Sequence, residues 1–245
     1  MNISGSGGKR RALAGIMVAA LLAAGCDKAE TPANQSTTVN LLLYQEQEAG
    51  IEPYPVRIMV NPAFVRFDDG YAGSDFMLME RATRTIYNVS HEERSILVIA
   101  NPPLASGLPD ELSLSEVRET DASAPLIAGK QPVHIRFLAN GEECYQALVV
   151  PGLLPEATAG LAEFAVLLGE RQRGDLQLVP ADMQTPCFLA RYAYAPERHL
   201  QEGLPVQEWD AAGYRRSLTD FRREETVSRG LFELPLDYER LQLGG

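Results

Sequence analysis

Residues 55–61 read Pro-Val-Arg-Ile-Met-Val-Asn, and residues 84–89 read Arg-Thr-Ile-Tyr-Asn-Val. In both runs the side chains alternate in character from one residue to the next, which is the period at which a strand places side chains on one face. Their β-branched and aromatic content is typical of strands. These two runs therefore predict β-structure for the chain around them.

Further short β-rich runs lie on either side of these two, separated by turn residues: 39–44, 64–67, 75–79 and 95–99. Connections this short favour antiparallel neighbours, because a parallel crossover needs about a dozen residues or more. Residues 39–99 are therefore predicted to form a meander. The runs 76–79 and 96–99 are apolar on both sides. We expect that both faces of this part of the sheet are covered, or that one face lines a cavity.

Strand signals return at 132–138 and 144–150, joined by Asn140-Gly141, a strong signal for a hairpin turn. One possible strand, 112–117, lies in a stretch rich in Pro, Ala, Ser and acidic residues. After Cys187 the chain continues as a series of predicted strands and apolar runs: 188–194, 204–209, 214–221, 223–227 and 231–236.

One helix is predicted, over residues 155–173. Leu154, Ala157, Leu161, Phe164, Ala165 and Leu168 recur at steps of three and four, while glutamates occupy the other side. Pro155 suits the first turn and Gly174 suits the end. A stripe this narrow is expected to pack on the sheet. The fold class predicted is α+β, an antiparallel sheet packed on one main helix, in a single domain over residues 39–245.

The N-terminus has the order of an export signal: Lys9-Arg10-Arg11, an apolar stretch at 12–24, then Gly25 and Cys26. The apolar stretch is shorter than the ~20 residues needed to cross a bilayer, so residues 1–25 are interpreted as a cleaved signal peptide. Residues 26–38 are polar and lack apolar periodicity, which predicts a flexible tether.

Residues 22–26, Leu-Ala-Ala-Gly-Cys, resemble a bacterial lipobox. The resemblance implies diacylglycerol on the Cys26 sulfur, cleavage before Cys26, and acylation, for example with palmitate, of the new amine. Three acyl chains exceed what stable membrane anchoring requires. Asp27 favours the periplasmic face of the inner membrane, with the outer membrane as the alternative. An ordinary signal peptide followed by an incidental cysteine is the competing interpretation.

The charge excludes one class of function. Lys and Arg number 22 and Asp and Glu 33, a formal charge of −11, and a chain beginning at Cys26 would have 19 bases against 33 acids, or −14. Such a surface repels the phosphate backbone of nucleic acids, so nucleic-acid binding is excluded as a main role. It also lacks a cluster of basic residues that could bind anionic lipid. With 45% hydrophobic and 22% charged residues, the chain is nevertheless typical of a globular protein.

Two cysteines remain besides Cys26, namely Cys144 and Cys187. In an oxidising compartment an even pair is expected to form a structural disulfide. The alternative is a redox or metal-binding pair, which neither CxxC spacing nor clustered histidines support.

Candidate chemistry is sparse. The histidines His91, His134 and His199 show no clustered spacing, and His134 is expected to face solvent. Residues 68–70, Asp-Asp-Gly, together with Asp75 could be interpreted as a calcium-binding loop, but they lack the ligand spacing of an EF-hand. A polar hairpin turn is therefore the preferred interpretation.

The arginine pairs 215–216 and 222–223, with Glu224-Glu225, are interpreted as solvated charge on edge strands. The sequence has no GxSxG elbow and no GxGxxG after a strand. We therefore predict no catalytic, cofactor-binding or metal-binding residues and no enzymatic activity.

The C-terminal part resembles a known superfamily. Gly203-Leu-Pro205, the turn 210–213, and Leu231-Phe-Glu-Leu-Pro235 followed by Asp237-Tyr238 are similar to the ending of several half-barrel families. Together with the order of export signal, lipobox, meander and helix, this resembles the periplasmic half-barrel superfamily of the LolA and LolB lipoprotein carriers. The resemblance implies a strongly curved antiparallel sheet, capped by helices, with an apolar concavity for acyl chains or partner segments.

Three functions follow as hypotheses. The first is an anchored, non-catalytic binding module for an apolar ligand or lipid tail. The second is an interaction or assembly protein of the envelope that recognises a protein partner. The third is a hydrolase with a noncontiguous site, which requires His, Ser or acidic side chains to converge in a cleft.

Overall fold

The structure is a computed structural model, and it describes residues 35–100 and 107–242. The predicted signal peptide, Cys26 and the first part of the predicted tether lie outside the described residues. Within the described ranges no helix is both long and apolar enough to pass through a membrane.

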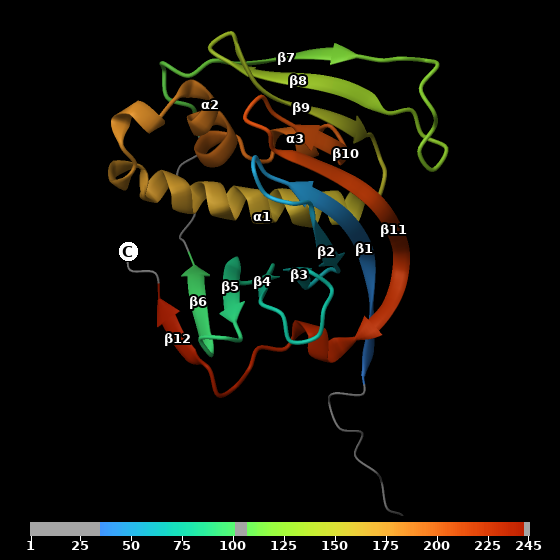
Figure 1. The fold of residues 1–245 in the computed structure, drawn as a ribbon, viewed down its shortest axis with the longest axis vertical. Helices are drawn as coiled ribbons and strands as arrows, with labels where there is room; N and C mark the ends of the chain where they lie inside the picture. The colour runs from blue at the N-terminus through green and yellow to red at the C-terminus, as the bar shows by residue number, and fades with distance from the viewer. Residues whose placement is uncertain (1–34, 101–106, 243–245) are drawn as a thin grey trace, which may run out of the picture. The chain divides into compact units, whose positions relative to one another are not determined.

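The strands form one twelve-stranded sheet. Figure 1 shows it together with one long helix, α1 (Pro155–Gly174). The strands are β1 (Ser36–Gln47), β2 (Tyr54–Val60), β3 (Phe64–Asp68), β4 (Phe76–Glu80), β5 (Thr85–Ser90), β6 (Ser95–Ala100), β7 (Leu114–Glu119), β8 (Val133–Ala139), β9 (Glu142–Val150), β10 (Leu204–Trp209), β11 (Arg215–Ser228) and β12 (Glu239–Gln242).

The helical elements follow β9, and all but the last precede β10. They are α1 (Pro155–Gly174), the 3₁₀ turns η2 (Leu176–Leu178) and η3 (Ala181–Met183), α2 (Pro186–Phe188), the π-helix η4 (Leu189–Tyr194), α3 (Arg198–Gln201) and the 3₁₀ turn η5 (Arg229–Phe232).

The strand order is β12-β6-β5-β4-β3-β2-β1-β11-β10-β9-β8-β7. Consecutive strands from β1 to β6 pair antiparallel, which confirms the predicted meander. The hairpin of β8 and β9 turns at Asn140 and Gly141, both with positive φ, as the Asn-Gly signal predicts. Among the described strands only β12 pairs in parallel, with β6.

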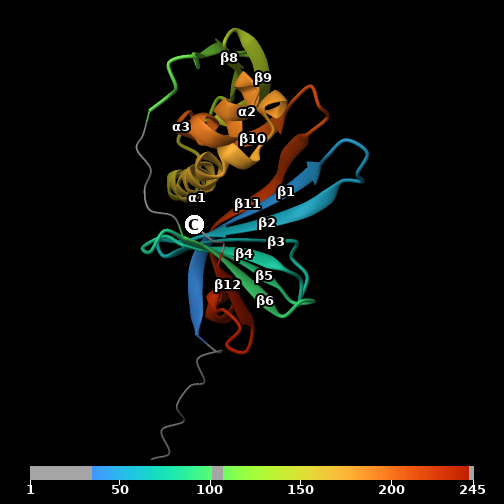
Figure 2. The ribbon, with the colours of Figure 1, turned by 90° about the vertical axis from the view of Figure 1, so that its left-hand side faces the viewer.

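Apolar side chains cover both faces of the meander. In β1, Leu42 and Tyr44 belong to the cluster beneath α1, whereas Leu41 belongs to a second cluster on the opposite face. Figure 2 shows α1 nearly end-on, on one side of β1, β2 and β11. The expectation that both faces are covered is confirmed.

The second face is covered by the C-terminal segment. Leu231, Phe232, Leu234 and Tyr238 pack against the cluster that contains Leu41. A buried arginine, Arg66, secures this cover, as its Nη1 donates to the carbonyl oxygen of Leu231 at 2.6 Å. Of the residues that suggested the half-barrel resemblance, those at 231–238 therefore serve as the cover of a sheet face, whereas 203–205 and 210–213 belong to β10 and its connections.

Asp68 neutralises the charge of that buried arginine. Its carboxylate binds Arg66 Nε at 2.6 Å and Arg57 Nε at 2.7 Å, and the Asp68 side chain is 1% exposed. Burial opposes the charge of Asp68, but the hydrogen bonds from Arg57 and Arg66 prevail and lower its pKa. Residues 69–75 form the hairpin connection between β3 and β4, so the predicted polar turn is confirmed.

Four sequence-based expectations need correction. The sheet is neither strongly curled nor closed, and both faces of β1–β6 are packed, so the described residues show no wide open concavity there. Residues 189–194 are helical rather than extended, since Ala190 and Ala193 pack one side of the segment inward. The runs 214–221 and 223–227 are one bulged strand, β11. β1 begins at Ser36, so residues 36–38 of the predicted tether pair with β11.

Helix α1 approaches the sheet closely at Gly160. A Cβ placed there would lie 2.7 Å from Val60 Cγ1 and 3.0 Å from Val65 Cγ2, both in fully buried side chains. Gly174, at the end of the same helix, has nothing within 4 Å of the equivalent position. Glycine at 160 is thus a packing requirement.

We predict that Gly160→Ala is less stable than Gly174→Ala by about 1–3 kcal/mol, the usual cost of overpacking a core. Gly160 lies in the helix interior and Gly174 is its last residue, so Gly160→Ala gains at least as much helix propensity, and a lower stability of that variant reports the contact with Val60 and Val65. Urea unfolding followed by circular dichroism measures it. Equal midpoints and slopes for the two variants would contradict the close approach.

Candidate functional site

Two adjoining cavities lie against the sheet, and α1 lines the first of them only. The first has a volume of about 320 Å³, and its apolar wall includes Leu161, Phe164 and Leu168 of α1. The second, of about 670 Å³, is lined by residues of β1–β5, among them Glu46, Tyr54 and Met77. Three residues, Phe67, Tyr214 and Arg216, line both. The cavities therefore meet at these three side chains, and their volumes fall in the range of small-molecule sites.

Arg216 occupies this junction because of strand register. It lies opposite Glu46 of β1 and opposite Glu208 of β10. Its Nε is 3.0 Å from Glu46 Oε1, and its Nη1 is 3.7 Å from Glu208 Oε2. The guanidinium carbon also lies 4.1 Å from the centre of the Tyr44 ring. One half-buried cation is thus held between two carboxylates over an aromatic face.

His199, at the start of the turn-long helix α3, extends this polar cluster. Its Nε2 is 3.2 Å from Glu208 Oε1, and its Nδ1 is 3.5 Å from the Tyr145 hydroxyl. Its side chain is 15% exposed. Burial lowers the pKa of His199, and Arg216 and Arg191 lower it further, against the opposing effect of Glu208.

The π-helix η4 supplies the outer wall. It presents Arg191, whose Nη1 is 2.5 Å from Asp210 Oδ2 and whose guanidinium carbon lies 4.9–5.5 Å from the ring centres of Tyr145, Tyr192 and Tyr214. An arginine held by a carboxylate and three aromatic rings fixes this wall in place. Single-turn π-helices occur often at functional sites.

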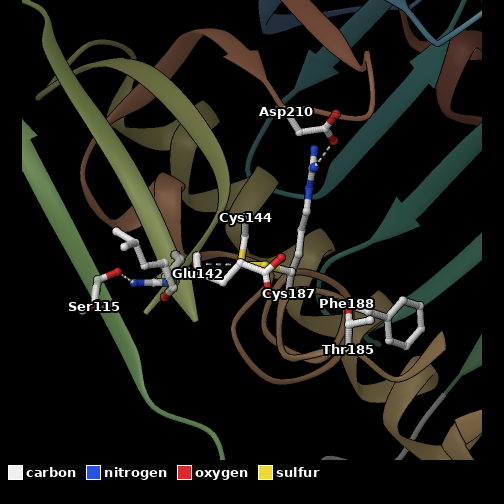
Figure 3. Close-up of a disulfide and its surroundings, with 10 residues drawn as sticks. Ser115, Glu142, Cys144, Thr185, Cys187, Phe188 and Asp210 are labelled. Atoms are coloured by element: carbon white, nitrogen blue, oxygen red, sulfur yellow. Dashed lines mark hydrogen bonds and ion pairs between the residues drawn. A yellow bond between two sulfur atoms is a disulfide. The ribbon is translucent and has the colours of Figure 1, made fainter. Parts of the chain in front are cut away.

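The disulfide Cys144–Cys187 ties the same wall to the sheet. It joins β9 to α2, with 5.1 Å between the Cα atoms, as the sequence predicted. Figure 3 shows the bridge near Thr185, Phe188 and Asp210. Cys187 precedes Arg191 by one helical turn, so the bridge limits how far η4 can move. Closing a loop of 43 residues stabilises the fold by about 4 kcal/mol in the chain-entropy model.

The cluster leaves one acceptor unused. Glu208 Oε2 is buried and makes no hydrogen bond within the part of the chain that the structure describes. Arg216 Nε and Nη2 are likewise buried without a hydrogen bond there, and the guanidinium lies over the Tyr44 ring. An unsatisfied buried carboxylate oxygen costs free energy, so it marks a place where a donor is favoured.

Glu46, the other carboxylate beside Arg216, also has a perturbed environment. Burial raises its pKa, and the neighbouring charges of Glu208 and Glu48 add to the rise while Arg216 opposes it. Across the junction, Tyr54 has a pKa raised to about 12, through burial and its hydrogen bond to Glu48. The second cavity is thus lined by a carboxylate, Glu46, whose negative charge is only partly balanced by Arg216.

The structure places the three histidines considered in the sequence analysis in separate parts of the fold. His91 lies in the β5–β6 turn, 2.8 Å from the Tyr238 hydroxyl. His134 is half-buried rather than facing solvent, since its ring stacks on Trp209 and its Nε2 is 2.7 Å from Gln146 Oε1. Only His199 belongs to the cluster. Among the described residues, no group of three or more His, Cys, Asp or Glu side chains could hold a metal ion.

The expectation for the arginine pairs was wrong for Arg216. Arg215, Arg222 and Arg223 are exposed, but the Arg216 side chain is 15% exposed. β11 lies between β1 and β10 in the strand order and is not an edge strand. Neither Glu46 nor Glu208 was singled out from the sequence. Glu208 stands inside the predicted strand 204–209, where a charged residue was the signal available, whereas Glu46 lies beyond the predicted run 39–44 and had no local signal.

The comparisons with known proteins show no family. No family model matches the chain, and no curated protein matches it. Among solved structures, an uncharacterized conserved protein from Thermus thermophilus is 13% identical with a TM-score of 0.39, over 84% of this chain and 91% of that one.

PNGF-II, in two crystal forms, is 7% and 8% identical with TM-scores of 0.37 and 0.38. The match covers 84% of this chain and 31% of PNGF-II, so the chain spans about a third of the length of PNGF-II. The likeness is that of a large, mostly antiparallel sheet.

We predict that lowering the pH from 7.5 to 5.5 destabilises the protein more than it destabilises His199→Gln. In the unfolded state His199 binds a proton near the ordinary pKa of histidine, whereas in the folded state its pKa is lowered by burial. Stability is therefore full above the unfolded pKa and falls as the pH drops below it, by at most about 1.4 kcal/mol per pH unit. Urea unfolding at both pH values measures this. His91 and His134 remain in both proteins, so an equal loss in the two would contradict a buried neutral His199.

Proposed function

We propose that this protein is a membrane-anchored lipoprotein of the cell envelope whose domain is a non-catalytic binding module for an apolar or amphipathic ligand. The observation that supports this most is the pair of cavities that meet at Phe67, Tyr214 and Arg216. A site with an apolar wall and a few buried polar groups at one end suits a ligand with an apolar chain and a polar end.

The shape of the first cavity supports an apolar chain. Leu161, Phe164 and Leu168 lie along one side of α1 and line this cavity, and Phe67 of β3 packs against Phe164 in its wall, with the two ring centres 4.4 Å apart. These side chains offer no hydrogen bonds to a ligand, so binding there would come from removing apolar surface from water.

Catalysis is not part of the proposal. His199 is 3.2 Å from Glu208, a pairing that could hold a proton, but it lies with Tyr145 at the buried end of the cluster. Of the described serines, none is among the residues that line the two cavities. The arrangement fits a polar end group better than a nucleophile with its base.

The anchor proposal rests on the sequence alone. The lipobox-like residues 22–26 support acylation of Cys26, and Asp27 supports retention at the periplasmic face of the inner membrane, with the outer membrane as the alternative. The relation to half-barrel carriers stays a proposal about ancestry, supported by the C-terminal residues 231–238.

We predict that Ala165→Trp removes bound ligand. Ala165 of α1 lines the first cavity, so an indole there occupies the space of a ligand chain. Native mass spectrometry of the full-length protein, released from detergent, should detect a copurifying small molecule on the unmodified protein and at least about tenfold less on the variant.

The matched control is Ala159→Trp. Ala159 is an exposed residue of the same helix and is not among the residues that line either cavity of the site. It should retain the ligand. Equal occupancy in both variants, or no copurifying molecule on the unmodified protein, would argue against the binding function.

We also predict that Cys26→Ser abolishes incorporation of labelled palmitate and shifts the protein out of the lipid-anchored fraction, because a hydroxyl does not replace the thiol as acceptor of the diacylglycerol. Palmitate labelling of cells, followed by immunoprecipitation, measures this. Unchanged labelling and membrane partition would refute the anchor without touching the binding site.

A further inference from the structure

We propose that two copies of this chain pair through β7, antiparallel and about a two-fold axis at Val117, so that their sheets continue into one another. The surface is a free edge of the sheet, and the partner is a second copy of the chain. None of the β7 residues lines either cavity of the site, so this inference does not depend on the proposed ligand.

β7 is the last strand at one end of the sheet, and its outer side has no strand partner among the described residues. Figure 1 shows it at the top of the sheet, beyond β8. The N–H of Asn140 donates to the carbonyl oxygen of Ser113 at 2.8 Å, and the register of β7 with β8 places these two residues opposite each other. Hydrogen-bonded and non-hydrogen-bonded pairs alternate along such a ladder, so the backbone groups of Leu114, Glu116 and Arg118 point away from β8. They form a template for a further strand.

β7 lacks the features by which edge strands usually avoid such pairing. It contains neither proline nor lysine, and its pairing with β8 runs from Leu114 to Glu119 without a bulge. Val117, in the middle of the strand, is apolar and 38% exposed. The edge is therefore regular and open to a second strand.

The order of charges along β7 selects the partner and the register. With Val117 opposite its own copy, Glu116 of each chain lies opposite Arg118 of the other, and opposite charges in such positions attract. An axis at Glu116 or at Arg118 would instead place that residue opposite its own copy, and like charges directly opposite are destabilising. Arg118 remains 52% exposed despite its contacts with Glu116 and Glu202 of its own chain, so it is accessible to a second carboxylate.

The same register matches the other face of the strand. Ser115 lies opposite Glu119 of the second copy, so a hydroxyl donor meets a carboxylate acceptor. The two Val117 side chains meet at the axis and remove apolar surface from water. The partner surfaces are thus complementary in charge, hydrogen bonding and polarity, as an interface between identical chains requires.

The pairing is weak, because two six-residue strands bury less than the roughly 1,000 Å² of a stable interface. Copies held on one membrane, as proposed above, meet at a higher effective concentration than copies in dilute solution. The pairing is therefore tested in whole cells that make the full-length protein.

The first test is disulfide crosslinking of Val117→Cys with copper phenanthroline. In a non-hydrogen-bonded pair the Cα atoms lie about 4.5 Å apart, within the span of a disulfide. The matched control is Ser115→Cys, an exposed position on the same strand and face. Its own copy lies four residues away along the strand, about 13 Å, which no disulfide spans. On non-reducing gels we expect at least about tenfold more dimer from Val117→Cys than from the control.

The second test exchanges charges in the Val117→Cys background. Glu116→Arg gives a copy with arginine at both positions, and Arg118→Glu gives a copy with glutamate at both. Each variant alone places like charges opposite each other, so its dimer should fall several-fold. Produced together with different tags, the two variants restore both opposite pairs and should crosslink to each other. Recovery in the mixture also shows that both variants fold.

Three results would overturn the pairing. The first is a dimer yield from Val117→Cys no higher than that from Ser115→Cys. The second is a crosslink from position 117 to a different protein in place of a second copy. The third is a mixture of the two charge variants that yields no more dimer than either variant alone.

Discussion

Strands β1–β6 carry apolar side chains on both faces, and water has to be excluded from both. The chain meets this requirement with two covers, α1 on one face and the C-terminal segment from Leu231 to Tyr238 on the other. Each cover is held by a specific contact. Gly160 lets α1 approach Val60 and Val65, and Arg66 binds the carbonyl of Leu231. Two-sided burial is also why the described residues of β1–β6 show no wide open concavity.

The cavities form where this covering is incomplete. α1 lies across β2, β3 and β10, and side chains at its edge leave space toward η4 and β11. There the strands place charges inward rather than apolar groups. Arg216 lies between the half-buried Glu46 and the buried Glu208, and removing one member of this ion triad would leave an uncompensated charge in a poorly solvated place.

Much of the fold could be predicted because it depends on local pattern. Alternation in residues 55–61 and 84–89, the Asn140-Gly141 turn and the helical period after Pro155 are signals contained in a few neighbouring residues, and each appears in the structure. The helical segment 189–194 was misread, because a short apolar run supports a strand and a helix equally well. The curvature expected from the half-barrel resemblance was wrong, since neither local pattern nor a short C-terminal match determines how a sheet bends.

By itself the sequence determined the order and type of most elements, the acidic surface and the pairing of Cys144 with Cys187, since these follow from composition and short-range pattern. The proposal of a lipid anchor at Cys26 rests on residues 22–26 alone. Only the tertiary structure decided the site. Glu46, His199, Glu208 and Arg216 come from four separate segments, and their meeting depends on β11 lying between β1 and β10. Pairing between distant strands is set by packing over the whole sheet, so no local stretch of the chain contains it.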